Sequence, residues 1–178
     1  MNAVIALDQS EFARQIVDAV VNRQWPAHTQ FNVVTVIEPL QWESVSCIEW
    51  NEVAVEALNR RKLIAHETLM EAKRRISQAV AGCEVHVETR HGSPRDQILN
   101  VASEWMADKI VLGAHGYHTQ LTTQSKHHAH HHFAGSVSRA VALRAPCCVE
   151  FVRLKSIPVD EAARKKEKKS HISTGKKK

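Results

Sequence analysis

Apolar and polar positions alternate along the first 153 residues of the chain in a way that predicts strands and helices in turn. Five short stretches are apolar throughout or at every second position, which is typical of buried and half-buried strands. The predicted strands lie within Ala3–Leu7, Phe31–Ile37, Glu84–Thr89, Lys109–Gly116 and Cys147–Val152. The fourth of these stretches runs directly into glycines.

Between the strands, apolar residues recur three, four or seven positions apart, which is the spacing of one helix face. Helices are predicted over Glu11–Asn22, over Asn51–Ala81, from Pro94 through Met106, and over Gly135–Arg144. Ser10 and Ser93 are suited to cap the first and third helices, because a serine hydroxyl can bond the first N–H groups. Gly82 is suited to end the second helix. Residues Leu40–Trp50 show no clear periodicity and fit either a loop or a short helix.

Strands that alternate with helices predict a parallel, doubly wound α/β sheet. In such a sheet, ligands bind at the carboxyl ends of the strands, at the point where the strand order reverses. Two turns are therefore the candidate ligand-binding segments: Asp8–Ser10 after the first strand, and the segment from Gly113 after the fourth. We expect one domain at residues 1–153, followed by a tail at residues 154–178.

The net charge of +5 is unevenly distributed along the chain. Residues from Lys155 onwards carry nine basic and three acidic side chains, which leaves 15 basic and 16 acidic residues before them. The tail has few apolar residues and no aromatic one, so it cannot bury enough surface to offset its ordering entropy. We expect a disordered, solubilising tail, with weak and salt-sensitive contact to anionic partners as the alternative.

The four cysteines show no C-x-x-C spacing, and the N-terminus enters a strand without a secretion signal. These features favour a reduced, cytoplasmic setting. Cys147 and Cys148 lie in the last predicted strand, where we expect them to be small buried residues. No apolar stretch approaches the roughly 18 residues that a membrane span needs, so no association with a membrane is expected.

Gly113 and Gly116 follow a buried strand, and Gly135 and Ser136 open a helix. Glycines let the backbone approach a phosphate closely, and the N-terminus of a helix offers N–H groups to an anion. Ser136 and Ser138 could each add a hydroxyl. The chain contains neither a G-x-x-x-x-G-K-[ST] loop nor a G-x-G-x-x-G fingerprint.

Five motifs stand out along residues 1–153: "VIALDQSEFA", "VVTVIEP", "GSPRDQIL", "ADKIVLGAHG" and "GSVSRAVALRAPCCVEFV". Taken together, these motifs resemble those of the universal stress protein family. Nucleotide-binding members share the pattern G-2x-G-9x-G-[ST], which Gly113 and Gly116 match at its start and Gly135-Ser136 at its end. The resemblance implies a flavodoxin-like, adenine-nucleotide-hydrolase-like α/β fold with three α/β/α layers and a five-stranded parallel sheet.

The same resemblance implies that ATP, with or without Mg²⁺, is bound at the switch point as a regulatory ligand in a stress response. It also implies a homodimer paired through the last strand, residues 147–152. Asp8 would contact the adenosine, and the backbone of Val36 would hold the adenine edge. The residues implied along the ribose and phosphates are Gly113, His115, Gly116, Gly135, Ser136, Val137 and Ser138.

The chain departs from the family pattern between the two glycine pairs. Gly116 and Gly135 are separated by 18 residues, where the pattern has nine. Doubling a loop costs only about 0.6 kcal/mol. An insertion near Thr122–His132 could therefore loop outwards and leave both halves of the motif in place, or it could occlude the phosphate slot.

Five histidines fall in this insertion: His127, His128, His130, His131 and His132. Neutral imidazoles can bind a transition metal such as Zn, Ni or Cu. No cysteine or acidic residue lies within the run, so it is not a ready structural metal site. A flexible polar insert, a metal site, a pH-sensing loop beside bound phosphates and an introduced tag-like run remain the alternatives.

The leading hypothesis is a nucleotide-binding regulatory protein in which ATP is a bound ligand. The alternative is an interaction or adaptor protein of the same fold that does not bind nucleotide and acts through its dimer face, its His-rich insert or its basic tail. An ATPase has the least support, because no motif places a residue as a catalytic base or a metal ligand.

Overall fold

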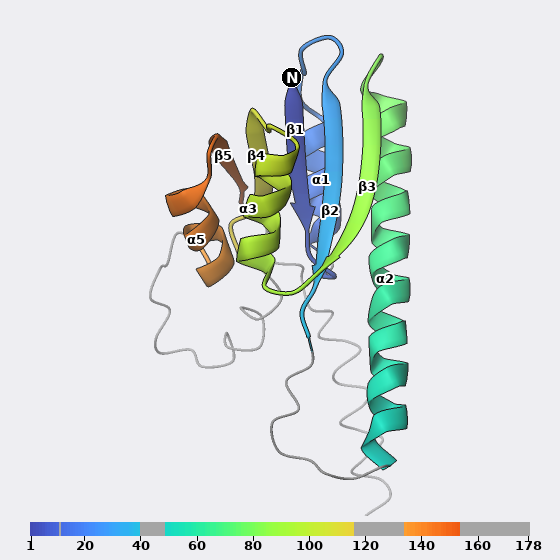
Figure 1. Cartoon of the computed structure of the whole chain (residues 1–178). Helices are drawn as coiled ribbons and strands as arrows, with labels where there is room; N and C mark the ends of the chain where they lie inside the picture. Colours follow the sequence, from blue (N-terminus) through green and yellow to red (C-terminus); the bar gives the residue numbers. More distant parts are fainter. Residues whose placement is uncertain (11, 40–48, 116–133, 154–178) are drawn as a thin grey trace, which may run out of the picture.

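The computed structural model describes residues 1–10, 12–39, 49–115 and 134–153, and for residues 49–53 the backbone alone. Strands and helices alternate along these residues, as the apolar pattern predicts (Figure 1). The elements are β1 (Asn2–Leu7), α1 (Ala13–Val21), β2 (Gln30–Ile37), α2 (Glu49–Ala79), β3 (Glu84–His91), α3 (Pro94–Glu104), β4 (Lys109–Gly113), α5 (Ser136–Arg144) and β5 (Cys148–Val152).

The five strands form one parallel sheet in the order β3-β2-β1-β4-β5. This arrangement confirms the predicted fold class. The strand β1 lies at the centre, where Ala3 pairs with Phe31 of β2 on one side and with Lys109 of β4 on the other. The strand order reverses between β1 and β4, since β2 and β3 extend the sheet in one direction and β4 and β5 in the other.

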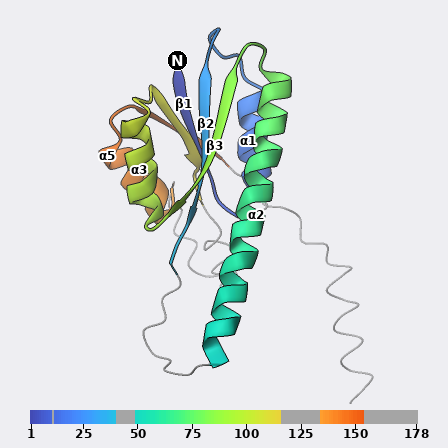
Figure 2. The same ribbon diagram turned by 45° about the vertical axis from the view of Figure 1, so that its right-hand side comes forward.

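Helices cover both faces of the sheet (Figure 2). The helices α1 and α2 pack on one face through Ile16, Val20, Leu69 and Ile76, around the fully buried Phe31. On the opposite face, α3 and α5 pack on β1 and β4 through a second cluster of buried residues: Ile98, Val101, Ala102, Val141, Val4, Ile110 and Leu112. The sheet lies between one layer formed by α1 and α2 and another formed by α3 and α5. These are the three layers that the resemblance implies.

Two details of the helices differ from the sequence prediction. The helix α1 starts at Ala13, with Phe12 rather than Ser10 as its N-cap. The predicted apolar face of α3 includes Met106, but α3 ends at Glu104 and Met106 is 80% exposed. Met106 has a φ of 44°, so it lies in a turn that leads into β4.

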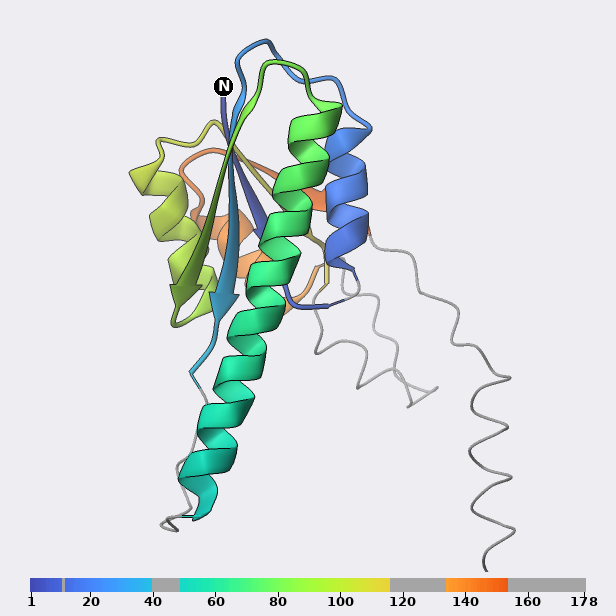
Figure 3. The ribbon, with the colours of Figure 1, turned by 90° about the vertical axis from the view of Figure 1, so that its right-hand side faces the viewer.

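The helix α2 is much longer than the strand that it covers. At about 1.5 Å per residue its 31 residues span about 46 Å, against about 26 Å for the eight residues of β2. Figure 3 shows that the N-terminal part of α2 therefore projects past the carboxyl edge of the sheet. The C-terminal part supplies the buried residues Ala65, Leu69, Ala72 and Ile76.

The edge strand β5 is held to the rest of the sheet by a polar cluster. The carboxylate of Glu150 on β5 accepts hydrogen bonds from the guanidinium of Arg23, which follows α1, and from Nζ of Lys109 on β4 at 3.2 Å. The Trp25 ring lies against both cations, 5.4 Å from Arg23 Cζ and 5.9 Å from Lys109 Nζ. Ion pairing and cation–π contacts thus tie β5 to β4 and to the segment after α1.

The sequence predicts that Cys147, just before β5, and Cys148, the first residue of β5, are both buried. This prediction is wrong for Cys148. Cys147 is half-buried against the α3–α5 core, while Cys148 is exposed. The reason is that β5 is an edge strand with no residue fully buried among its five.

The Glu150 cluster predicts a pH-dependent stability. The hydrogen bonds from Arg23 hold the pKa of the Glu150 carboxyl below its ordinary value, with Lys109 acting in the same direction and burial opposing both. A lowered pKa means that the stabilisation is present above the ordinary glutamate range and is lost as the pH falls through the folded-state pKa. Glu150→Gln should destabilise the protein by about 1 kcal/mol at pH 7 and by less in acid, as measured by urea unfolding at both pH values.

The control for this variant is Glu71→Gln, which removes an exposed pair with Arg74 within one helix. This change should affect stability at pH 7 less than Glu150→Gln does, because exposed pairs are screened by solvent. An equal loss of stability from Glu150→Gln in neutral and acid solution would contradict the ion-pair account.

Candidate functional site

The carboxyl ends of all five strands lie at one edge of the sheet, and the order of the strands reverses between β1 and β4. The last pair across this switch point is Ala6 with Leu112. Asp8 and Gly113, which each follow this pair by one or two residues, therefore emerge side by side. This brings together the two turns that the sequence singles out.

The turn after β1 is organised by the Asp8 carboxylate. Oδ1 of Asp8 accepts a hydrogen bond from the N–H of Ser10 at 3.2 Å and from the Ser10 hydroxyl at 2.5 Å. The Ser10 hydroxyl in turn accepts the N–H of Phe12 at 3.2 Å. Ser10 thus stabilises the turn before α1 instead of capping the helix, and the half-buried carboxylate of Asp8 is held at the switch point.

The two halves of the glycine motif are joined by direct hydrogen bonds. The N–H of Gly135 donates to the carbonyl of Ala114 at 2.7 Å, and the hydroxyl of Ser138 donates to the carbonyl of Gly113 at 2.9 Å. The N–H of Ala114 donates to the carbonyl of Val152 at 2.9 Å, which ties the same turn to β5. The long segment between the halves thus leaves and rejoins the fold at adjacent points.

The four residues at the start of α5 have different environments. Gly135 is the N-cap, and a Cβ placed on it would lie 3.6 Å from the Ala114 carbonyl oxygen, which is ordinary contact. Ser136 is exposed, whereas Ser138 is 4% exposed and its hydroxyl is already bonded. Val137 packs against the α3–α5 core, so it can offer a ligand only its backbone.

Val36 lies one residue past the last β1–β2 pair, Leu7 with Thr35, and is still paired with Arg90 of β3. Its side chain packs against the core on the α3 side. The backbone of Val36 is therefore at the carboxyl edge, next to the Asp8 turn. His115 follows directly on the Gly113 turn and is half-buried.

Two hydrogen bonds at this edge are not predicted by the sequence. Nε2 of Gln9 donates to the carbonyl of Arg61 on α2 at 3.2 Å, and the Arg61 guanidinium donates to the carbonyl of Glu38 after β2 at 3.0 Å. The partners lie 52 and 23 residues apart in the chain. Arg61 reads in sequence as one of many charged residues on an amphipathic helix, so no local signal marks it.

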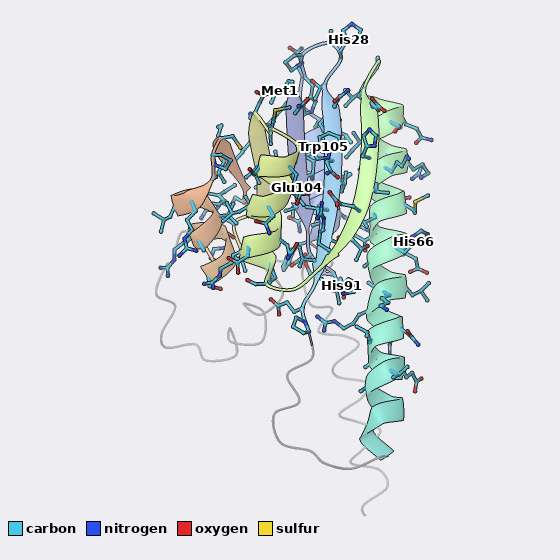
Figure 4. All side chains as sticks on the ribbon, in the orientation of Figure 1. Met1, His28, His66, His91, Glu104 and Trp105 are labelled. Atoms are coloured by element: carbon cyan, nitrogen blue, oxygen red, sulfur yellow. The ribbon has the colours of Figure 1, made fainter. Side chains whose placement is uncertain are left out.

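Gly116 and the run of His127, His128 and His130 to His132 lie outside the described residues, as does the basic tail. Within the described ranges, no group of three His, Cys, Asp or Glu residues is arranged to hold a metal ion. Figure 4 shows, for example, that His28 and His91 lie at opposite ends of the sheet. The metal prediction for the histidine run stays a prediction.

A model of the universal stress protein family matches residues 1–153. The chain belongs to the universal stress protein family. Among curated relatives, the universal stress protein Sll1388 from Synechocystis is 25% identical over 159 residues, covering 84% of this chain and 96% of the relative. Among the described residues of this chain, no helix combines the length and the apolarity that crossing a membrane demands.

Solved structures of universal stress proteins share the fold. UspA from Lactobacillus plantarum has a TM-score of 0.62 at 20% identity, covering 87% of this chain and 97% of its own. A family protein from Arabidopsis thaliana with AMP bound has a TM-score of 0.57 at 15% identity, covering 91% and 98%. A universal stress protein in complex with cAMP has a TM-score of 0.55 at 21% identity, covering 87% and 98%.

Ser138 is predicted to support the position of α5. Ser138→Ala removes the donor to the Gly113 carbonyl inside a buried contact, so it should lower the free energy of unfolding by about 1 kcal/mol. Ser136→Ala, an exposed change two residues earlier in the same helix, is the control and should have little effect. Urea unfolding followed by circular dichroism measures both, and equal stability of the two variants would contradict the prediction.

Proposed function

We propose that this universal stress protein binds an adenine nucleotide at the switch point between β1 and β4, with ATP as a regulatory ligand. The observation that carries the proposal is the joining of the two motif halves: Gly135 is bonded to Ala114, and Ser138 to Gly113. These bonds hold the N-terminus of α5 beside the end of β4. The AMP and cAMP complexes of structurally similar family members support the choice of an adenine nucleotide.

The donor set at the edge fits the two chemically different parts of such a ligand. On the β1–β2 side, the Asp8 carboxylate can accept hydrogen bonds from ribose hydroxyls, and the backbone of Val36 can pair with the adenine edge. On the β4–α5 side, the first N–H groups of α5 have no partner within the helix and carry the positive end of its dipole. A phosphate chain is the ligand that such an end favours.

In this proposal the phosphates lie along Gly113, His115 and Gly116 and reach Gly135, Ser136 and Val137. Ser136 can donate its exposed hydroxyl, and Val137 its N–H. Ser138 acts differently from the other residues. Its hydroxyl donates to the Gly113 carbonyl and so links α5 to the end of β4. The hydrogen bond between Ala114 and Gly135 supports this arrangement, because it holds together the residues on the two sides of the insertion.

Titration calorimetry with ATP, in the presence and absence of Mg²⁺, tests the proposal. Asp8→Ala should weaken binding by about tenfold or more, since a hydrogen bond to a charged group is lost. Ser10→Ala is the matched control: it removes the same turn contact but keeps the carboxylate, so it should weaken binding less. Absence of binding by the wild-type protein, or equal affinity of wild type and Asp8→Ala, would reject the assignment.

Gly135→Ala separates the phosphate side from the nucleoside side. The new methyl group finds only ordinary contacts in the protein, so the fold should persist. It would occupy the backbone surface that a phosphate approaches, so ATP affinity should fall more than adenosine affinity.

The alternative function, an adaptor without nucleotide, predicts in addition that denatured protein releases no nucleotide detectable by mass spectrometry.

We further propose that the protein is a homodimer paired through residues 147–152. An edge strand presents unpaired backbone groups that a second copy can bond. The five residues of β5 are all at least partly exposed, and Cys148 is exposed at the start of the strand. Light scattering coupled to size-exclusion chromatography should therefore give about twice the 20.0 kDa chain mass. A single-chain mass at micromolar concentration would contradict this proposal.

A further inference from the structure

Three segments that are distant in sequence meet at Arg61, and we call Gln9, Glu38 and Arg61 the α2 clamp. Gln9 follows β1 and donates its side-chain N–H to the main-chain carbonyl of Arg61 at 3.2 Å. Glu38 follows β2, and its main-chain carbonyl accepts a hydrogen bond from the Arg61 guanidinium at 3.0 Å. One helical residue thus holds the loops that leave two neighbouring strands.

Each of these loops is adjacent to a residue of the proposed nucleoside side. Gln9 is the immediate neighbour of Asp8, and Glu38 lies two residues after Val36. β1 and β2 are paired only as far as Leu7 with Thr35. β3 holds β2 as far as Ile37, but this pairing does not join the loop after β1 to the loop after β2. The clamp supplies the missing restraint between them.

Arg61 is itself held firmly. One turn later on α2, Ala65 is 0% exposed, and Leu69 after it is 3% exposed, so the helix is anchored in the core just beyond the clamp. Arg61 is half-buried, whereas its neighbour Arg60 is exposed. The N-terminal part of α2 projects past the sheet (Figure 3). The hydrogen bond to the carbonyl of Glu38, which follows β2, places Arg61 at the carboxyl edge.

The clamp lies away from the proposed phosphate side. The helices α2 and α5 cover opposite faces of the sheet, and β1 separates β2 from β4 in the strand order (Figure 2). The guanidinium of Arg61 is directed to the carbonyl of Glu38 on the β2 side. A contact from Arg61 to the phosphates at the N-terminus of α5 does not fit this placement.

We propose that Arg61 is a positioning residue for the nucleoside part of the ligand, acting through the loops that carry Asp8 and follow Val36. The proposal rests on the proposed function. It predicts a specific pattern: loss of the clamp weakens the binding of adenosine, AMP and ATP by the same factor, because all three ligands share the nucleoside. A residue that touched phosphate would instead weaken ATP more than adenosine.

The test compares Arg61→Met with Arg60→Met in the full chain. Both variants remove one positive charge from adjacent positions of α2 and keep an aliphatic stem, so they share any long-range electrostatic effect. Calorimetry with adenosine, AMP and ATP should show about three- to tenfold weaker binding of each ligand by Arg61→Met relative to Arg60→Met. Equal affinities of the two variants would overturn the proposal, and so would a loss that grows from adenosine to ATP.

Hydrogen exchange of the ligand-free protein tests the clamp independently of nucleotide. The N–H groups of Ser10, Phe12 and Ala13 take part in the turn next to Gln9. Their exchange should accelerate by about threefold or more in Gln9→Ala, which removes the donor to the Arg61 carbonyl, and stay unchanged in Arg60→Met. Arg61→Met keeps that main-chain carbonyl and removes the bond to Glu38, so it should instead accelerate exchange of the Gly92 N–H, which donates to the carbonyl of Ile37 next to Glu38. The amide of Arg139 in α5 should be unaffected in all three variants, since it bonds the Gly135 carbonyl on the other side of the switch point.

The two experiments separate the possible failures. If wild-type protein binds no nucleotide, the proposed function fails and the role of Arg61 in binding fails with it, while the exchange data still report on the clamp. If wild-type protein binds and Arg61→Met matches Arg60→Met, the proposed function stands and the inference fails. Unchanged exchange at Ser10, Phe12 and Ala13 in Gln9→Ala, or of the Gly92 N–H in Arg61→Met, would show that the clamp does not hold the corresponding loop.

Discussion

The reversal of strand order between β1 and β4 is the constraint on which the rest of the structure depends. β2 pairs with one side of β1, and β4 pairs with the other side. The chain continues from β1 to α1 and from β4 to α5, and these two helices lie on opposite faces of the sheet. In α/β sheets of this kind, the carboxyl edge at such a reversal is where ligands bind. Asp8 and Gly113 are neighbours only because of this topology.

Each side of the switch point is braced separately. On the β1–β2–β3 side, α2 links the loops after β1 and β2, and the N–H of Gly92 donates to the Ile37 carbonyl at 3.1 Å. On the β4–β5 side, Ala114 is bonded to both Gly135 and Val152. The polar cluster around Glu150 then fixes β5 against α1 and β4. The two groups of loops at the proposed site are thus held by separate sets of contacts.

The glycine motif shows how a fold tolerates extra length between the two halves of a motif. Spacing along the chain matters little when the ends of a segment are held in place by tertiary contacts, since loop entropy grows only slowly with length. Here the hydrogen bond between Gly135 and Ala114 and the buried contact of Ser138 with Gly113 keep the two halves of the motif together. The departure from the family spacing therefore does not separate them.

The apolar pattern determined the elements of this protein and their order, because the spacing of buried side chains in a strand or helix is a local property of the sequence. It placed α2 and α3 to within a few residues and identified the turns at Asp8 and Gly113. It misjudged Ser10, Met106 and Cys148, whose surroundings depend on where a helix starts, where a turn falls and which strand lies at an edge. The order of the strands, the closure of the glycine motif and the reach of Arg61 to Glu38 were decided only by the tertiary structure. They join residues tens of positions apart, and a local pattern carries no information about such contacts.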